Sequence, residues 1–265
     1  VGIVLLMFLA ILPWAVQYRL AELLGNLAFK SMKSRRETTI RNLELCFPEW
    51  IPELVYENSR QVFIDQMLGV FETLNAWYSP KWFKGRVSIE GLEHIQEAQT
   101  NGQGALLLGI HSTLLDAGGY ICAQHFDPDV VYRPQNNPLL DMLIYRCRAT
   151  IYTNQIDHDD MRGLVRHLKD GRLIWYSPDQ DFGLKQGVMA PFFGIPAATV
   201  TAHRRLIKMT KAAAIPLYFY RTGDIANPQY HILIEPALDN LPSEDEVADA
   251  TQVNLVIERL LRIAP

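Results

Sequence analysis

Short apolar runs alternate with stretches of helical period from residue 91 to the end of the chain. Runs bounded by Gly, Pro or charged residues are typical of buried strands, whereas apolar residues spaced three and four apart are typical of amphipathic helices. This alternation predicts an α/β core in which a mixed sheet is flanked by helices in a doubly wound arrangement. The expected strands are residues 105–108, 130–133, 173–176, 213–220 and 230–235, and the expected helices are residues 114–126, 139–148, one ending near 169, one reaching 211 and 244–262.

Before residue 91 the pattern is helical throughout. Residues 20–45 have basic side chains on one side and apolar ones on the other, and the stretch between Pro48 and Pro52 breaks this helix. A long amphipathic helix is expected from about residue 53 to 77. The pattern therefore divides the chain into residues 1–18, a helical region at 19–90 packed on the core, and the α/β core at 91–265.

Residues 1–18 carry no charge and are mostly apolar. As a helix rising about 1.5 Å per residue they would extend roughly 27 Å, just short of a hydrocarbon core near 30 Å. The basic residues that follow, such as Arg19 and Lys30, place the rest of the chain on the cytoplasmic side of a membrane. We expect a membrane anchor, with a buried core helix as the alternative. Because the chain begins with Val, we also expect residues to precede it.

Composition narrows the possible functions. The net charge of −4 gives no case for nucleic-acid binding. The three cysteines are far apart in apolar surroundings, which indicates a reducing compartment. The acidic run around His158 could hold a metal, but acids in the first turn of a helix are the more common explanation, so no metal and no cofactor are expected.

His111 comes two residues after Gly109, which closes the apolar run that starts after Gly104, and Asp116 comes five residues later. Ligands of open α/β sheets bind where the strands end, and a carboxylate near an imidazole fixes its tautomer and supports its charge. His111 is therefore a candidate general base, with Asp116 to orient it. The alternative is a structural hydrogen bond at the start of a helix, and the spacing alone does not decide between them.

Several motifs give the chain a family resemblance that covers nearly its whole length. It resembles the bacterial late acyltransferases of lipid A biosynthesis, which transfer lauroyl or myristoyl chains to Kdo2-lipid IVA. The matching stretches are RNLELCFPE (41–49), HSTLLD (111–116), VYRP (131–134), NPLLD (137–141), WYSPDQDFG (175–183) and PFFG (191–194).

The resemblance implies an N-terminal membrane anchor, a core related to the glycerolipid acyltransferases, and acyl carrier protein as the acyl donor. It also implies membrane lipids as partners and a location at the bacterial inner membrane, with the catalytic domain on the cytoplasmic face. Two departures stand out: several such enzymes have Glu at the position of Asp116, and they usually continue beyond the position of Pro265 with an aromatic and basic tail.

The implied acceptor is a hydroxyl on a 3-hydroxyacyl chain of a phosphorylated glycolipid. His111 would take the hydroxyl proton while Asp116 stabilises the imidazolium, and the activated thioester makes a covalent enzyme intermediate unnecessary. Arg133 and Arg148 are candidates to bind the phosphates, with plain surface charge as the alternative. Asp179 and Asp181 could bond sugar hydroxyls or hold the arginines, or they could simply form a tight turn.

Other functions remain open from the residues alone. The same His/Asp pair could activate water in a membrane-associated thioesterase, or serve a different glycolipid or phospholipid acyltransferase. A lipid-binding protein without catalytic activity is the third possibility. Free acid as the product from an acyl carrier protein thioester would identify the thioesterase, whereas an acylated glycolipid would identify the acyltransferase. In a lipid-binding protein, replacement of His111 would leave the function intact.

Overall fold

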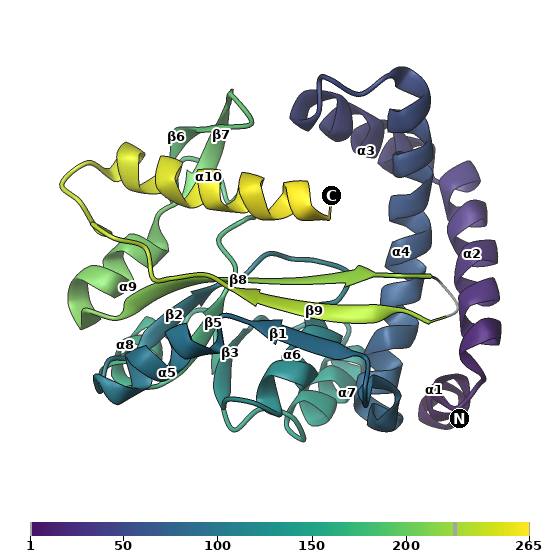
Figure 1. Ribbon diagram of the computed structural model, residues 1–265, viewed down its shortest axis with the longest axis horizontal. Helices are drawn as coiled ribbons and strands as arrows, with labels where there is room; N and C mark the ends of the chain where they lie inside the picture. Colours follow the sequence, from purple (N-terminus) through teal and green to yellow (C-terminus); the bar gives the residue numbers. More distant parts are fainter. Residues whose placement is uncertain (1, 225–226, 265) are drawn as a thin grey trace. The chain divides into compact units, whose positions relative to one another are not determined.

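A computed structural model describes residues 2–224 and 227–264 (Figure 1). The chain forms two compact units. The helical unit contains the residues up to Arg86 together with Thr113–Ala117 and Thr222–Gln229, and the sheet unit contains Val87–Ser112, Gly118–Arg221 and the chain from Tyr230 onward. Val1, the first residue of the expected anchor, and Pro265, the last of the expected core, lie outside the described residues.

The sheet unit is built on seven strands in the order β1-β9-β8-β2-β5-β3-β4. The described pairs β1/β9, β2/β8, β2/β5, β3/β5 and β3/β4 are parallel, and β8 and β9 run in opposite directions (Figure 1), so the expected mixed sheet is confirmed. Its strands are β1 (Val87–Glu90), β2 (Ala105–Leu108), β3 (Pro128–Tyr132), β4 (Gln155–Asp157), β5 (Leu173–Tyr176), β8 (Ala213–Thr222) and β9 (Gln229–Ile234).

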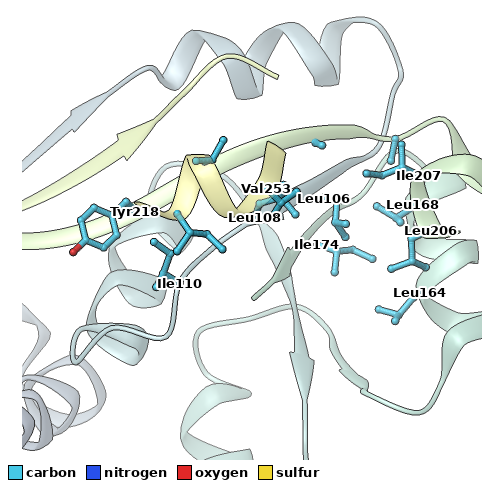
Figure 2. Close-up of a cluster of buried hydrophobic side chains, with 14 of the residues drawn as sticks. Leu106, Leu108, Ile110, Leu164, Leu168, Ile174, Leu206, Ile207, Tyr218 and Val253 are labelled. Atoms are coloured by element: carbon cyan, nitrogen blue, oxygen red, sulfur yellow. The ribbon is translucent and has the colours of Figure 1, made fainter. Parts of the chain in front are cut away.

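The run between the two glycines, β2, is the central strand of this sheet and is buried at all four positions. Strands covered on both faces read as continuous apolar runs, which is why this stretch has no polar alternation. Figure 2 shows Leu106 of β2 beside Ile174 of β5, within a cluster of buried side chains that also includes Leu206 and Val253. Each fully buried aliphatic side chain contributes about 1.5–3 kcal/mol to stability.

Helices flank this sheet, as expected. They are α5 (Leu92–Thr100), α6 (Leu115–Ala123), α7 (Pro138–Arg148), α8 (Met161–Lys169), α9 (Ala202–Thr210) and α10 (Glu246–Ile263). Except for α5, the ends of these helices match the predicted ones to within a few residues. Two short strands, β1 and β4, were not predicted, because four or fewer residues leave little periodicity to detect. The nine-residue helix α5 was missed as well.

A hairpin, β6 (Gly187–Phe192) and β7 (Ile195–Val200), precedes α9 and was not predicted from the sequence. Pro191 and Pro196 pair with each other in this two-stranded sheet, where proline is tolerated because both strands are edges. Phe193 and Gly194, with φ of 49° and 74°, form the tight turn between them. Helix α10 packs against β6.

The helical unit consists of α1 (Gly2–Ala10), α2 (Trp14–Ser31), α3 (Lys33–Cys46), α4 (Pro52–Tyr78) and the 3₁₀ turn η1 (Pro80–Phe83), with Thr113–Ala117 and Thr222–Gln229. Helix α2 packs along α4, and Gly25 permits the close approach: a Cβ there would lie 2.6 Å from the Cα of Ile64. Trp14 of α2 stacks on Trp82 of η1, with ring centroids 4.6 Å apart.

The expected single anchor helix over residues 1–18 is wrong in its shape. Helix α1 ends at Ala10 and α2 begins at Trp14, and the two helices are bent by 112° relative to one another. Pro13 causes the break, because it disfavours helical backbone at the residue before it and cannot donate a helical hydrogen bond. No single helix among the described residues is long and apolar enough to cross a membrane, although this bent pair together meets the length and hydropathy criteria.

Buried polar groups stabilise the break between α1 and α2. The side-chain nitrogen of Gln17 lies 3.2, 3.2 and 3.0 Å from the carbonyl oxygens of Leu9, Ala10 and Leu12, and its two N–H groups are shared among the acceptors around it at the end of α1. Gln17 and Asn75 of α4 also exchange side-chain hydrogen bonds. The bend is therefore a built feature of the helical unit.

The helix expected over residues 20–45 is also divided, at Met32, into α2 and α3. The guanidinium of Arg36 donates to the carbonyl oxygens of Phe29 and Lys30 at 2.8 and 3.2 Å. A basic side chain at a helix C-terminus satisfies free carbonyls and complements the helix dipole. Arg36, which belongs to α3, therefore caps the C-terminus of α2.

Candidate active site

Three parallel neighbours in the sheet, β2, β5 and β3, end at the same edge of the sheet unit. The loop after β2 contains His111, the loop after β5 contains Asp179 and Asp181, and the residue after β3 is Arg133. Because neighbouring strands are about 4.8 Å apart, the ends of β2 and β3 are separated by about 10 Å. Ligands of open α/β sheets bind at such an edge, beyond the carboxyl ends of the strands.

His111 and Asp179 meet at this edge. The Nδ1 atom of His111 lies 2.6 Å from Oδ1 of Asp179, and the backbone N–H of His111 donates to Oδ2 of the same carboxylate at 2.8 Å. An ionised carboxylate only accepts hydrogen bonds, so Nδ1 carries the proton and Nε2 of the neutral imidazole keeps its lone pair. The histidine side chain is 40% exposed and Asp179 is 14% exposed, so a substrate can reach the imidazole.

Asp116, the partner suggested by the spacing, lies in the first turn of α6 and is half-buried. It belongs to the segment Thr113–Ala117 of the helical unit. Its role beside His111 stays a prediction. Sequence reasoning missed the pairing of Asp179 with His111 and suggested sugar hydroxyls or arginines for that carboxylate instead.

Asp181 forms the tight turn that was the alternative to a binding role, since its Oδ1 accepts the backbone N–H of Gly183 at 2.6 Å. Arg133 is exposed and Arg148 is half-buried in the last turn of α7. Arg148 lies near the Tyr132 hydroxyl. Their binding of phosphate stays a prediction.

The start of α7 is fixed to the end of β3 through Asp141. Its carboxylate accepts a hydrogen bond from the Tyr132 hydroxyl and another, at 2.7 Å, from the backbone N–H of Gln135. Burial, followed by the hydrogen bond to Asp141, raises the pKa of Tyr132 to about 12. The loop that contains Arg133 is thereby held at both ends.

The acidic run before α8 behaves as a helix entry. Asp160 is the N-cap, and its side chain accepts the N–H of Gly163 at 2.8 Å. Ligand atoms of Asp157, His158 and Asp159 lie within 4.8 Å of one another, but all three residues are exposed. The Oδ1 atom of Asp157 accepts the N–H of Asp159, which is the main reason that the pKa of Asp157 is lowered.

Comparisons with known proteins give the site its context. The sequence model of the bacterial lipid A biosynthesis acyltransferases matches residues 1–265. The chain is 35% identical over 270 residues to the lipid A biosynthesis lauroyltransferase of Escherichia coli K12, covering all of this chain and 86% of that protein. It is 31% identical to the palmitoleoyltransferase of the same strain, covering 96% of this chain and 83% of that protein, and 26% identical to the myristoyltransferase, covering 97% and 80%.

Among solved structures, the chain matches the 1-acyl-sn-glycerophosphate acyltransferase PlsC of Thermotoga maritima. The TM-score is 0.44 at 14% identity, covering 93% of this chain and 95% of that one. The family match over the full length and the 35% identity to the lauroyltransferase are what establish the relationship. The chain belongs to the bacterial lipid A biosynthesis acyltransferases.

Proposed function

We propose that this acyltransferase moves a fatty acyl chain from the thioester of acyl carrier protein to a hydroxyl of a 3-hydroxyacyl chain on a Kdo2-lipid IVA-type precursor. The observation that carries the proposal is the doubly hydrogen-bonded pair of His111 and Asp179 at the strand-end edge of the sheet. The full-length match to the lipid A acyltransferase family supports the class of acceptor.

His111 is the general base in this proposal. As the acceptor oxygen attacks the thioester carbonyl, Nε2 takes the hydroxyl proton, and the new C–O bond forms while the C–S bond breaks. The imidazolium then returns the proton to the departing thiolate, which leaves as the thiol. A positioned base of this kind contributes roughly 10²- to 10⁴-fold to the rate.

Two carboxylates assist His111 in the proposal. Asp179 fixes the tautomer, because its hydrogen bond places the proton on Nδ1 and leaves Nε2 free to act as the base. Asp116, at the start of α6, adds negative charge that favours the imidazolium. Arg133 and Arg148 bind phosphates of the acceptor, for which the planar guanidinium offers two parallel hydrogen bonds.

Mass spectrometry of the products tests this function. The purified enzyme is mixed with the precursor glycolipid and with acyl carrier proteins that carry chains of different length. The proposal predicts a glycolipid heavier by one acyl chain. Free fatty acid with an unchanged glycolipid would instead identify a thioesterase, and acylation of an added lysophospholipid in preference to the glycolipid would identify a different acyltransferase.

The bent pair α1/α2 is proposed to attach the enzyme to the cytoplasmic face of the inner membrane. It exposes many large apolar side chains, among them Leu5, Phe8, Leu23 and Leu27, which are 55–64% exposed. Exposed apolar surface of this size is typical of membrane or protein contacts. Exposed basic residues lie on and after α2, and they complement an anionic lipid surface: Arg19, Lys30, Lys33 and Arg35.

Flotation with vesicles that contain phosphatidylglycerol tests the attachment. We expect the enzyme to float with the vesicles and to stay bound in high salt. A double variant with Leu23→Asp and Leu27→Asp should remain in solution, whereas the matched control with Leu54→Asp and Val70→Asp, at exposed positions of α4, should still float. Release of the unaltered enzyme by salt alone would contradict apolar attachment.

A further inference from the structure

The indole of Trp175 touches both of the backbone segments that lead to the His111–Asp179 pair. Trp175 is the third residue of β5, is 4% exposed, and lies in register with Leu107 of β2. It is therefore a core residue one position before the carboxyl end of β5, and its indole N–H faces a specific partner.

The first contact is with the segment that leads to His111. A Cβ added to Gly109 would lie 2.3 Å from Nε1 of Trp175, closer than real Cβ contacts allow, and 3.1 Å from Cδ1. The indole thus occupies the space above Gly109, two residues before His111. Any side chain at this position would displace either the ring or the backbone that leads to the histidine.

The second contact is with the segment that leads to Asp179. The indole Nε1–H donates to Oγ of Ser177 at 3.1 Å, two residues before Asp179. The intervening residue, Pro178, is buried, has a fixed φ, and restricts Ser177 to an extended backbone. The direction in which Asp179 leaves β5 is therefore set by how Ser177 is held.

The indole itself has little room to move. Its ring packs on Phe219 with centroids 4.8 Å apart. Gly119 of α6 approaches it from another direction, since a Cβ there would lie 3.1 Å from Cζ3 of Trp175. A ring enclosed in this way holds its N–H in one place.

We propose that Trp175 is a positioning residue for the catalytic pair, acting through Ser177 and Gly109. The indole spaces the β2 loop from the β5 loop so that one carboxylate of Asp179 receives both the backbone N–H and Nδ1 of His111. This inference rests on the proposed role of His111 as general base. It assigns the pre-organisation of that base to a single hydrogen bond in the core.

Two substitutions that each remove this hydrogen bond test the inference. Trp175→Phe keeps a ring over Gly109 and against Phe219 but removes the N–H, and Ser177→Ala removes the acceptor. Each should lower kcat about 3- to 10-fold, the effect of losing one neutral hydrogen bond, with both KM values within about twofold. Because both changes break the same bond, the double variant should be no slower than the slower single variant.

Two further variants control for general effects. Ser177→Thr keeps the hydroxyl that accepts the hydrogen bond, so this variant should retain most of the parent kcat. Trp77→Phe makes the same chemical change on α4, at a buried indole nitrogen for which no partner was found in the described part of the chain. It should leave kcat unchanged. A loss of rate in Trp77→Phe equal to that in Trp175→Phe would overturn the inference.

Exchange of the His111 Nδ1 proton with water, measured by NMR on the resting enzyme, separates this inference from the proposed function. Loosening Asp179 should speed the exchange several-fold in Trp175→Phe and in Ser177→Ala, the second of which keeps the core intact. Unchanged exchange in Ser177→Ala would overturn the positioning role, even if His111 is the base. Full activity of His111→Ala would overturn the proposed function, even if the exchange responds as expected.

Discussion

The backbone N–H and the imidazole of His111 both donate to the carboxylate of Asp179, 68 residues further along the chain. Two hydrogen bonds to one carboxylate fix the position of the histidine backbone and the tautomer of its ring together. In the proposed mechanism, Nε2 is therefore a base whose geometry is already set before the substrate binds.

Asp179→Asn should lower kcat about 10²-fold, because a neutral amide no longer stabilises the imidazolium formed during proton transfer. The comparison variant is Asp116→Asn, which should lose rate but retain more activity than His111→Ala. Only Asp179→Asn should alter the NMR signal of the His111 Nδ1 proton. An altered Nδ1 signal in Asp116→Asn together with an unaltered one in Asp179→Asn would reverse the two assignments.

Neutralising Arg133 or Arg148 should raise the glycolipid KM about 10- to 100-fold, the range expected from losing a hydrogen bond to a charged group. The donor KM should barely change. Lys at either position should rescue only in part, because a point charge lacks the guanidinium fork. With a dephosphorylated acceptor, the parent enzyme and the variant should have the same glycolipid KM. An equal loss of kcat on both acceptors would show that the arginine supports the fold of the site.

Asp129 is a fully buried carboxylate near the start of β3, and it accepts hydrogen bonds from Arg172, His167 and Asn154. Replacing it with Asn should cost about 3 kcal/mol in the free energy of unfolding, because a charge is removed from a buried ion pair. Asp127→Asn is the matched control, since this partner of Arg172 is half exposed and exposed pairs contribute at most about 1 kcal/mol.

The pH dependence of Asp129 has a definite sign. Burial alone would raise the pKa of this carboxyl, but the hydrogen bonds from Arg172, Asn154 and His167 bring it below its ordinary value of 3.8. Its contribution to stability is therefore complete above that value and is lost as the pH falls below it. Urea titrations of the Asp129→Asn variant should show a weaker dependence on pH below about 4.

His203, in the first turn of α9, is fully buried, and neither of its ring nitrogens has a hydrogen-bond partner among the described residues. Burial lowers the pKa of His203 to about 4 from 6.5, although the nearby carboxylate of Asp249 opposes the shift. The unfolded chain therefore binds a proton first as the pH falls, and stability declines from pH 6.5 to about 4. The decline should be about 3 kcal/mol.

His203→Leu should remove most of this decline, because the new side chain cannot take up a proton in either state. At pH 8 the variant should be as stable as the parent or more so, since no buried hydrogen bond is lost. Denaturant unfolding at pH 8, 6 and 4.5 measures both effects. A parallel pH dependence in parent and variant would contradict the assignment of the decline to His203.

Local patterns predicted strands β2, β3, β5, β8 and β9 and helices α6 to α10 of the sheet unit, but they missed β1, β4, α5 and the hairpin of β6 and β7. The glycine-bounded run of β2 and the strand β5 were predicted residue for residue, because fully covered strands need continuous apolar side chains. Pro13 is a helix-breaking residue, but the absence of charge over residues 1–18 favoured the prediction of a single anchor helix. Buried partners such as Gln17 and Asn75, which stabilise the bend, are far apart in the sequence.

The pairing of His111 with Asp179 could not be read from the sequence, because it depends on β5 lying next to β2. Strand order follows from the packing of the whole sheet, and the nearest acid in the sequence, Asp116, was the natural first choice. The signal available was that Asp179 follows a buried parallel strand, so its loop had to open on the same edge as His111.

The central claim is that His111 is the general base of acyl transfer to the lipid A precursor. The most direct test is the single-turnover rate of acyl transfer by His111→Ala, with saturating acyl carrier protein thioester and glycolipid, in a variant whose circular dichroism and vesicle binding match the parent. The account predicts a rate lower by about 10²- to 10⁴-fold, with the glycolipid still bound. Transfer within a few-fold of the parent rate by this well-folded variant would contradict it.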